Sequence, residues 1–191
     1  MRRYPFVDKS GLDIGSLEDV ILRPKDLYPS HLLLGAGFFE EYMEEIGKRE
    51  NIDEIAELGL VTIIGDEYFQ VESNVADLPL TKDGTLGIPG VLFSSLSTLK
   101  IFDGESEIDA ELFDLEFDYE KSSFVINHYN LQSQLRGAGY YQRLEVYYPI
   151  KYITVTDTQL ILPITTEQLF DRIQKEMEPL YKGKSAYYYT P

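Results

Sequence analysis

The chain has 191 residues, a formal net charge of −16 at pH 7 and no cysteine. The missing cysteine excludes disulfides, thiolate zinc sites and cysteine nucleophiles, and the large excess of carboxylates argues against ordinary nucleic-acid binding. The length fits one domain with a core of its own. Two arginines near the start are followed by charged residues instead of an apolar run, so no signal peptide is predicted.

Residues 1–29 carry turn-forming Gly and Pro between short apolar pieces, and this predicts an N-terminal arm. After Pro29 the apolar residues follow helical spacing, and glutamates occupy the opposite side of the expected helix. Those apolar positions recur at every fourth residue: Leu34, Phe38, Tyr42 and Ile46. This spacing predicts an amphipathic helix ending near Gly47. A second short helix completes a helical segment over residues 30–58.

Residues 60–163 predict a β-rich body. Leu60–Ile64 and Glu67–Glu72 are strand-like runs joined by Gly65-Asp66, which predicts a two-residue hairpin turn. Residues 73–97 form a long loop rich in Pro and Gly, and loops of that length are usually functional or partner-bound. The remaining strands are predicted at Thr98–Phe102, 105–120, Ser123–Tyr129, Tyr140–Tyr148, Lys151–Thr156 and Gln159–Leu162, with a break in the sheet at Gln132–Gly139.

The acidic segment, residues 105–120, alternates apolar side chains with carboxylates and has no Lys or Arg. Its alternation changes phase between Leu112 and Phe113. A strand keeps its apolar side chains on one face across such a change only if one extra residue is inserted, as in a β-bulge. We therefore predict a bulged strand with one negative face, and we expect Phe113, Phe117 and Phe124 in the core.

The clearest helix signal lies near the C-terminus. Thr165 and Gln168 form a capping box, which predicts a helix over residues 165–182. The apolar residues at helical spacing are Leu169, Ile173, Met177 and Leu180. An aromatic tail, residues 183–191, follows this helix. It contains three consecutive tyrosines that cannot all face one core, and tyrosine is enriched at interfaces, so we expect the tail to contact another protein.

Together these elements predict an α+β fold in a single domain over residues 1–191. An antiparallel, meander or sandwich-like sheet stands between the N-terminal helical segment and the C-terminal helix. No catalytic, cofactor-binding or metal-binding residue is predicted, because neither His31 nor His128 has a recognisable nucleophile or orienting partner. We therefore expect a protein that is not an enzyme and needs no cofactor. The candidate protein-interaction residues are Tyr187, Tyr188, Tyr189, Glu107, Asp109, Glu111, Asp114 and Glu116.

The stretch from Tyr152 to Pro163 reads Tyr-Ile-Thr-Val-Thr-Asp-Thr-Gln-Leu-Ile-Leu-Pro and runs into the helix at residues 167–180. The chain therefore ends in a strand, a D-T-x-L-x-L-P stretch and a helix. This ending resembles that of some tail-adaptor proteins, which belong to the assembly proteins of tailed-phage virions. Those are head–tail connector, neck, completion and terminator subunits. The resemblance implies a structural virion protein, assembled in the host cytoplasm, that forms a ring of identical subunits and touches neighbouring structural proteins without specific nucleic-acid or membrane binding.

The acidic strand leaves other interpretations open. Its carboxylates form a solvated face, repel nucleic acid, or dock on a basic partner. In the last case the chain is an acidic inhibitor or immunity-type protein, cytoplasmic and monomeric, that masks a basic partner. An enzyme with an unrecognised carboxylate site is a further alternative, and it predicts a deep pocket with raised carboxylate pKa values.

Overall fold

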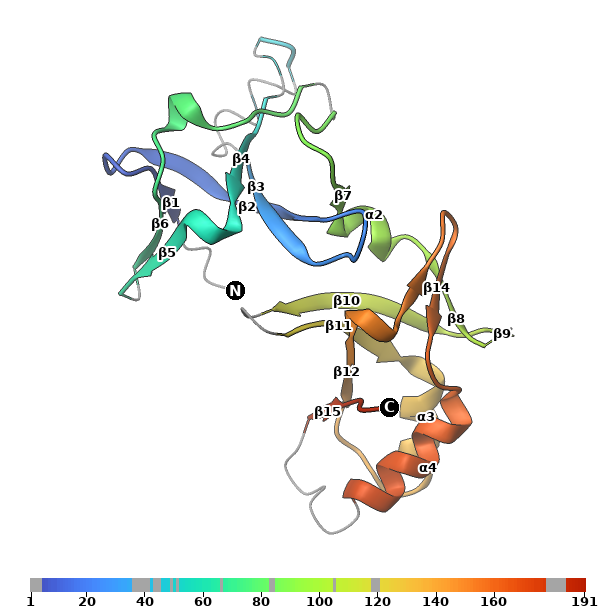
Figure 1. Cartoon of the computed structure of the whole chain (residues 1–191). Helices are drawn as coiled ribbons and strands as arrows, with labels where there is room; N and C mark the ends of the chain where they lie inside the picture. The colour runs from blue at the N-terminus through green and yellow to red at the C-terminus, as the bar shows by residue number, and fades with distance from the viewer. Residues whose placement is uncertain are drawn as a thin grey trace. The chain divides into compact units, whose positions relative to one another are not determined.

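In the computed structural model of the chain (Figure 1), the structure describes residues 5–35, 42, 46–48, 50, 52–65, 67–82, 85–104, 106–117, 121–177 and 185–191. The chain divides into two compact units, Met1–Ser94 and Ser95–Pro191. The boundary falls within residues 73–97, the segment predicted as a long loop. That segment contains a 3₁₀ turn (Val75–Asp77), strand β7 (Val91–Leu92) and helix α2 (Phe93–Ser97), and is more regular than predicted.

The first unit is built on a seven-stranded sheet with the order β4-β3-β2-β1-β6-β5, in which β7 also pairs with β2. The strands are β1 (Pro5–Val7), β2 (Asp13–Leu22), β3 (Pro29–Gly35), β4 (Glu54–Glu57), β5 (Val61–Ile64), β6 (Tyr68–Val71) and β7 (Val91–Leu92). Every pairing is antiparallel except that of β1 with β6. Ile21, Leu33 and Ile55 form the centre of its core.

The predicted N-terminal helical segment is wrong. Its beginning forms β3 and its end forms β4, which continues into a 3₁₀ turn at Leu58–Leu60. The physical reason lies in Leu32, Leu33 and Leu34, which are all buried because β3 is paired on both sides and covered on both faces. A continuous apolar run does not separate strand from helix by period alone. Of the predicted helix, residues 36–41 and 43–45 lie outside the described residues.

Two other predictions for this unit concern its first residues and its hairpin. In the predicted arm, residues 5–7 and 13–22 form β1 and β2, which lie inside the sheet instead of over it. The hairpin is confirmed, because β5 and β6 pair antiparallel and Gly65 adopts φ +57°, a left-handed conformation suited to glycine.

The second unit contains two four-stranded sheets, ordered β10-β11-β12-β15 and β13-β14-β8-β9. Their strands are β8 (Lys100–Asp103), β9 (Ser106–Glu107), β10 (Ala110–Phe117), β11 (Ser122–His128), β12 (Glu145–Pro149), β13 (Thr154–Val155), β14 (Gln159–Leu162) and β15 (Ala186–Tyr188). Pairs β12·β15 and β14·β8 are parallel. The β-rich prediction holds, but the purely antiparallel meander is wrong.

The helices of the second unit are α3 (Tyr129–Gly137) and α4 (Thr166–Met177), with a 3₁₀ turn at Ile150–Tyr152. α3 occupies the predicted break in the sheet. The capping box is confirmed, because the Thr165 backbone N–H donates to Gln168 Oε1 and the Gln168 N–H donates to Thr165 Oγ1, both at 3.3 Å. Figure 1 shows α3 and α4 side by side, and the two helices pack together. Leu131, Leu135, Leu169 and Ile173 supply their buried side chains.

The β-bulge is confirmed at its predicted place. Leu112 pairs with Ile126 and Asp114 pairs with Val125, so Phe113 is the extra residue. Leu112 and Leu115 are buried on either side of the bulge, but Phe113 is 48% exposed. Its predicted core position is therefore wrong, because the inserted residue has no partner across the ladder to fix its face. Phe124 is fully buried as predicted, and Phe117 is half-buried.

Candidate protein-interaction surface

The aromatic tail ends as a strand of its own unit. Ala186, Tyr187 and Tyr188 pair in parallel with residues 145–147 of β12. Successive side chains of a strand point to opposite faces, so the three tyrosines separate. Tyr187 and Tyr189 are 5% and 4% exposed on the face that α4 covers, whereas Tyr188 is 56% exposed on the opposite face. Of the three predicted interaction tyrosines, the structure leaves one at the surface.

Tyr187 and Tyr189 hold the tail against α4. The Tyr187 hydroxyl donates to Glu176 Oε2 at 2.8 Å, and burial followed by this hydrogen bond raises the pKa of Tyr187. The Arg172 guanidinium lies 5.5 Å from the centre of the Tyr189 ring and donates to the Thr190 carbonyl at 2.6 Å. These contacts make the two tyrosines core residues of the second unit.

The opposite face of the same sheet brings the predicted acidic residues and the remaining tyrosine together. Its members are Glu111, Asp114, Glu116, Glu145, Tyr147 and Tyr188, and we call it the acid–tyrosine face. The Tyr188 hydroxyl donates to Glu116 Oε1 and the Tyr147 hydroxyl to Glu145 Oε2, each at 3.2 Å. The two rings stack with their centres 4.5 Å apart. The Tyr188–Glu116 bond reaches from β15 to β10, across β11 and β12.

The tyrosines of this face stay protonated and donate to the carboxylates. Burial, and then the hydrogen bond to Glu145, raises the pKa of Tyr147 to about 12. Burial, and then the charge of Glu116, raises the pKa of Tyr188. Each carboxylate accepts one hydrogen bond from a tyrosine and has further lone pairs for a partner.

The other predicted acidic residues each make a different contact. Glu111 accepts a hydrogen bond from the Asn127 side-chain amide at 3.1 Å and another from Tyr129, and the Tyr129 bond is the main reason its pKa is lowered. Asp114 Oδ1 accepts from the Leu115 backbone N–H at 2.8 Å, next to the bulge. Glu107 lies on β9 and is paired with Lys100 at 2.7 Å.

Sequence reasoning missed Glu145 and Tyr147. Both lie on β12 and alternate with the buried Val146 and Tyr148, a pattern that was available in the sequence. The sequence pattern does not show that β12 pairs with β15. Asp109, which was predicted, is exposed just before β10 and is not a member of the face.

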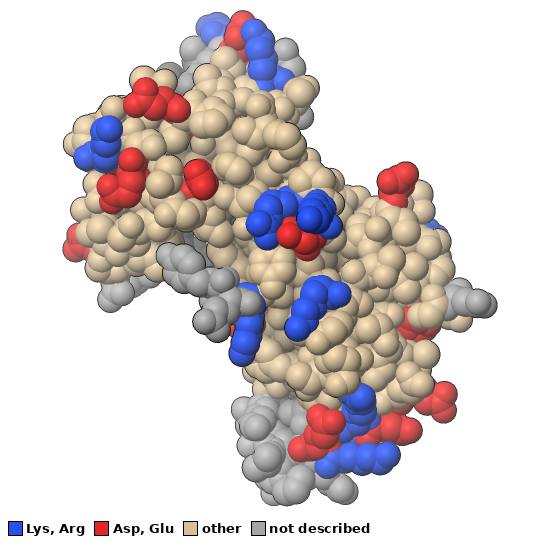
Figure 2. Space-filling model, in the orientation of Figure 1, with Lys and Arg blue, Asp and Glu red and all other residues tan. Residues whose placement is uncertain are grey.

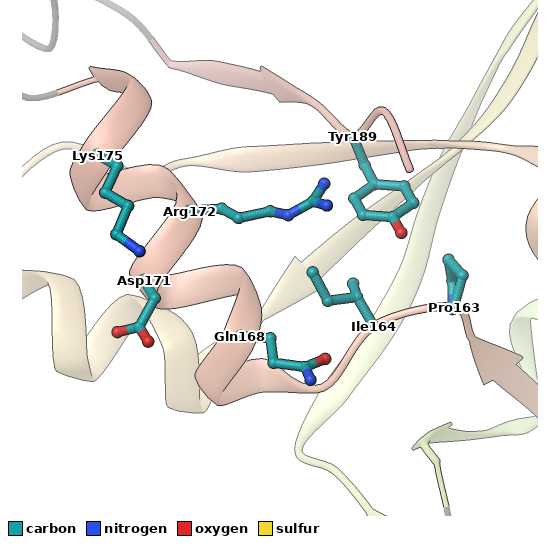
Figure 3. A pocket seen from close by; sticks show the side chains of 7 residues that line it. All are labelled: Pro163, Ile164, Gln168, Asp171, Arg172, Lys175 and Tyr189. Carbon is teal, nitrogen blue, oxygen red and sulfur yellow. The ribbon is translucent and has the colours of Figure 1, made fainter.

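A shallow groove lies on the helix side of the same sheet, with a volume of about 420 Å³. Figure 3 shows its lining residues: Pro163, Ile164, Gln168, Asp171, Arg172, Lys175 and Tyr189. Gln168, Arg172 and Lys175 recur on one side of α4, and the Tyr189 ring forms the facing wall. We call this feature the α4 groove. Figure 3 shows Arg172 directed toward the Tyr189 ring and Lys175 directed toward Asp171.

The two histidines occupy structural positions. His128 is 4% exposed, its Nε2 lies 2.9 Å from the Tyr148 hydroxyl, and burial lowers its pKa to about 4. It is therefore neutral in the core. His31 is half-buried on β3 with its Nδ1 3.0 Å from Ser30 Oγ, and burial lowers its pKa.

Other surface and site features can be stated for the part of the chain that the structure describes. No group of three or more His, Asp or Glu side chains is arranged to hold a metal ion there. None of the helices in that part combines the length and the apolar character needed to cross a membrane. On the face shown in Figure 2, basic and acidic side chains lie in mixed groups instead of one field of a single sign.

No model of a known protein family matches the chain, and no curated protein matches it.

Proposed function

We propose that the chain is a structural protein of a tailed-phage virion, a ring-forming subunit of head–tail connector, neck or tail-adaptor type. It acts through protein–protein contacts and not through catalysis. In this proposal it assembles in the host cytoplasm and touches identical subunits and neighbouring structural proteins. The contacts run through the faces of the second unit, because the tail tyrosines Tyr187 and Tyr189 are used within that unit.

The observation that supports this proposal is the conformation of the segment that carries the resemblance. Residues 154–155 and 159–162 form the strands β13 and β14, and the D-T-x-L-x-L-P stretch ends at Pro163. The chain then enters α4 through the Thr165–Gln168 capping box. The strand and helix ending that the resemblance implies is therefore formed by these residues.

The arrangement of the second unit also suits an assembly subunit. β10 is an edge strand, and β15 is the opposite edge strand of the same sheet. Edge strands present backbone groups to which another chain can add a strand. The acid–tyrosine face spans the sheet between these two edges and exposes Tyr188, and tyrosine is a residue type enriched at interfaces.

The mass of the assembled chain tests the proposal. Size-exclusion chromatography with light scattering, and native mass spectrometry, should give a closed oligomer of identical subunits whose rings are visible by negative-stain electron microscopy. A chain that stays monomeric over the whole accessible concentration range would contradict the proposal.

A second candidate function is favoured by the acid–tyrosine face itself. Four carboxylates around a stacked tyrosine pair suit a basic protein surface, as an acidic inhibitor or immunity-type protein requires. This candidate predicts a monomer that forms a tight complex with a basic protein, and the complex should weaken as salt is raised. The oligomeric state of the isolated chain separates the two candidates.

A further inference from the structure

We propose that the strand β5, at the edge of the first unit's sheet, pairs antiparallel with β5 of a second copy of the chain, with Thr62 facing Thr62 of that copy across a two-fold axis. This contact goes beyond the proposed function. It lies in the first unit, and two copies complete it because each supplies the same strand. It is therefore separate from the faces of the second unit through which a ring would form.

β5 is paired on one side only. It is the last strand of the first unit's sheet (Figure 1), and its partner strand is β6. The Glu72 backbone N–H donates to the Leu60 carbonyl at 2.9 Å. Since backbone groups alternate in direction along an antiparallel strand, Leu60, Thr62 and Ile64 direct theirs toward β6. The residues between them direct their backbone groups toward the open edge.

The open edge presents backbone groups of Val61 and Ile63. The Val61 N–H is used within the chain, because it donates to the Leu58 carbonyl at the end of the 3₁₀ turn. The Ile63 N–H and the carbonyls of Val61 and Ile63 form no hydrogen bond with a described residue outside β6. One donor and two acceptors thus remain for an added strand.

An apolar row on one face of the sheet ends in an exposed side chain at β5. Phe6 on β1, Phe69 on β6 and Ile63 on β5 lie in register with one another. Phe6 is 2% exposed and stacks on Phe69 with ring centres 4.8 Å apart, whereas Ile63 is 68% exposed. An added β5 strand places Val61 of the second copy beside Ile63 as the next member of the row.

The charge of the chain favours β5 as the meeting point of two copies. Copies with a net charge of −16 repel each other, so contact is favoured where carboxylates are absent. Residues 58–65 contain no charged residue. The edge strands β4, β9 and β10 carry Glu or Asp, and such charges protect an edge from pairing. The uncharged strands β7, β13 and β15 have only two or three residues, so β5 is the longest uncharged edge strand in the described part of the chain.

The sequence of β5 also fits its own antiparallel copy. With the axis beside Thr62, Val61 of each copy lies opposite Ile63 of the other. The Ile63 N–H of each copy then donates to the Val61 carbonyl of the other, and the Val61 N–H keeps its bond to Leu58. Thr62 faces Thr62 at a position without ladder hydrogen bonds, where side chains come closest and Thr–Thr pairs are favourable.

The contact is small, because β5 contributes four residues. Interfaces below about 1,200 Å² are typical of weak, transient complexes. We therefore expect a dimer that forms at high protein concentration. Added salt should strengthen it, because screening reduces the repulsion between two acidic copies. A complex of the acid–tyrosine face with a basic protein has the opposite salt dependence.

A single introduced cysteine tests the register, because the chain has no cysteine of its own. Thr62→Cys brings the Cα atoms of two copies to about 4.5 Å, within the range that a disulfide spans. The matched control is Gln70→Cys, the partner of Thr62 on β6. It leaves β5 unchanged, and its two thiols are three strand spacings apart, about 14 Å, which is too far for a disulfide.

Both cysteine variants are oxidised mildly at high protein concentration and run on non-reducing gels. Each yield is normalised to the rate at which the thiol reacts with a small disulfide reagent. Thr62→Cys should form a covalent dimer, and Gln70→Cys should not. Equal normalised yields for the two variants would refute the pairing.

A lysine at the open edge tests the strength of the contact. Ile63→Lys places a charge on the pairing edge, so sedimentation equilibrium should give a dimer dissociation constant roughly tenfold or more above that of the wild type. Ile63→Val keeps an apolar, β-branched side chain and should dimerise like the wild type. Circular dichroism melting checks that both variants are folded. An unchanged dissociation constant for folded Ile63→Lys contradicts the proposal.

The outcomes separate this contact from the ring proposal. If the wild type forms rings and Thr62→Cys does not cross-link above the Gln70→Cys control, the β5 contact is refuted and the ring proposal stands. If Thr62→Cys cross-links and the wild type forms nothing larger than a dimer, the ring proposal fails and the β5 contact stands.

Discussion

Replacing Tyr187 by alanine should destabilise the second unit far more than the same change at Tyr188, the next residue along the chain. Tyr187 is 5% exposed and donates to Glu176, whereas Tyr188 is 56% exposed. Truncating a buried aromatic residue to alanine costs about 3–5 kcal/mol. Truncating Tyr188 removes one ring stack and one exposed hydrogen bond, together about 1 kcal/mol.

Urea unfolding measures this difference directly. With a slope of about 2 kcal/mol per molar urea, the Tyr187→Ala midpoint should fall by roughly 1.5–2.5 M, and the Tyr188→Ala midpoint by about 0.5 M. Hydrogen exchange at the β12 amides assigns the loss to the second unit. Equal midpoints for Tyr187→Ala and the wild type would show that the tail is not a strand of this unit, and the separation of core and surface tyrosines would then be refuted.

Two further predictions address burial of a histidine and close packing of a glycine. Because the pKa of His128 is lowered from 6.5 to about 4, the unfolded chain binds a proton at higher pH than the folded one, so stability should fall as pH drops from 6.5 toward 4. His128→Gln should flatten this dependence in urea titrations at several pH values, and an unchanged slope contradicts it. Gly87→Ala should cost about 1–3 kcal/mol, because the new Cβ meets the Leu80 backbone carbonyl. Gly35→Ala should cost less in thermal melting, because the nearest atom to its new Cβ is the end of the flexible Glu18 side chain.

The sequence pattern predicts local features well where a single physical rule decides them. The phase change at Leu112 requires one extra residue in a strand, and the bulge occurs there. The capping box at Thr165 fixes the start of α4, because its two hydrogen bonds are made between neighbouring residues. Neither feature depends on what lies next to it in the fold.

Features that depend on distant partners could not be predicted in the same way. Leu32–Leu34 form a strand because β2 and β4 pair with β3 on its two sides, and helical spacing in the sequence does not contain that information. Phe113 faces solvent because it is the unpaired residue of the bulge. The direction of each tail tyrosine follows from the parallel pairing of β15 with β12, which joins segments about forty residues apart (residues 145–147 and 186–188).

The pairing of β15 also links the two candidate surfaces of the second unit. Tyr188 completes the acid–tyrosine face, and Tyr189 completes the wall of the α4 groove, although the two residues are neighbours in the chain. Removing residues 185–191 would therefore damage both surfaces and the core in one step. A loss of assembly after such a truncation would not show which surface makes the contact. Only substitutions that leave β15 in place, such as Lys175→Glu on one side and Glu116→Lys on the other, separate the contribution of each surface.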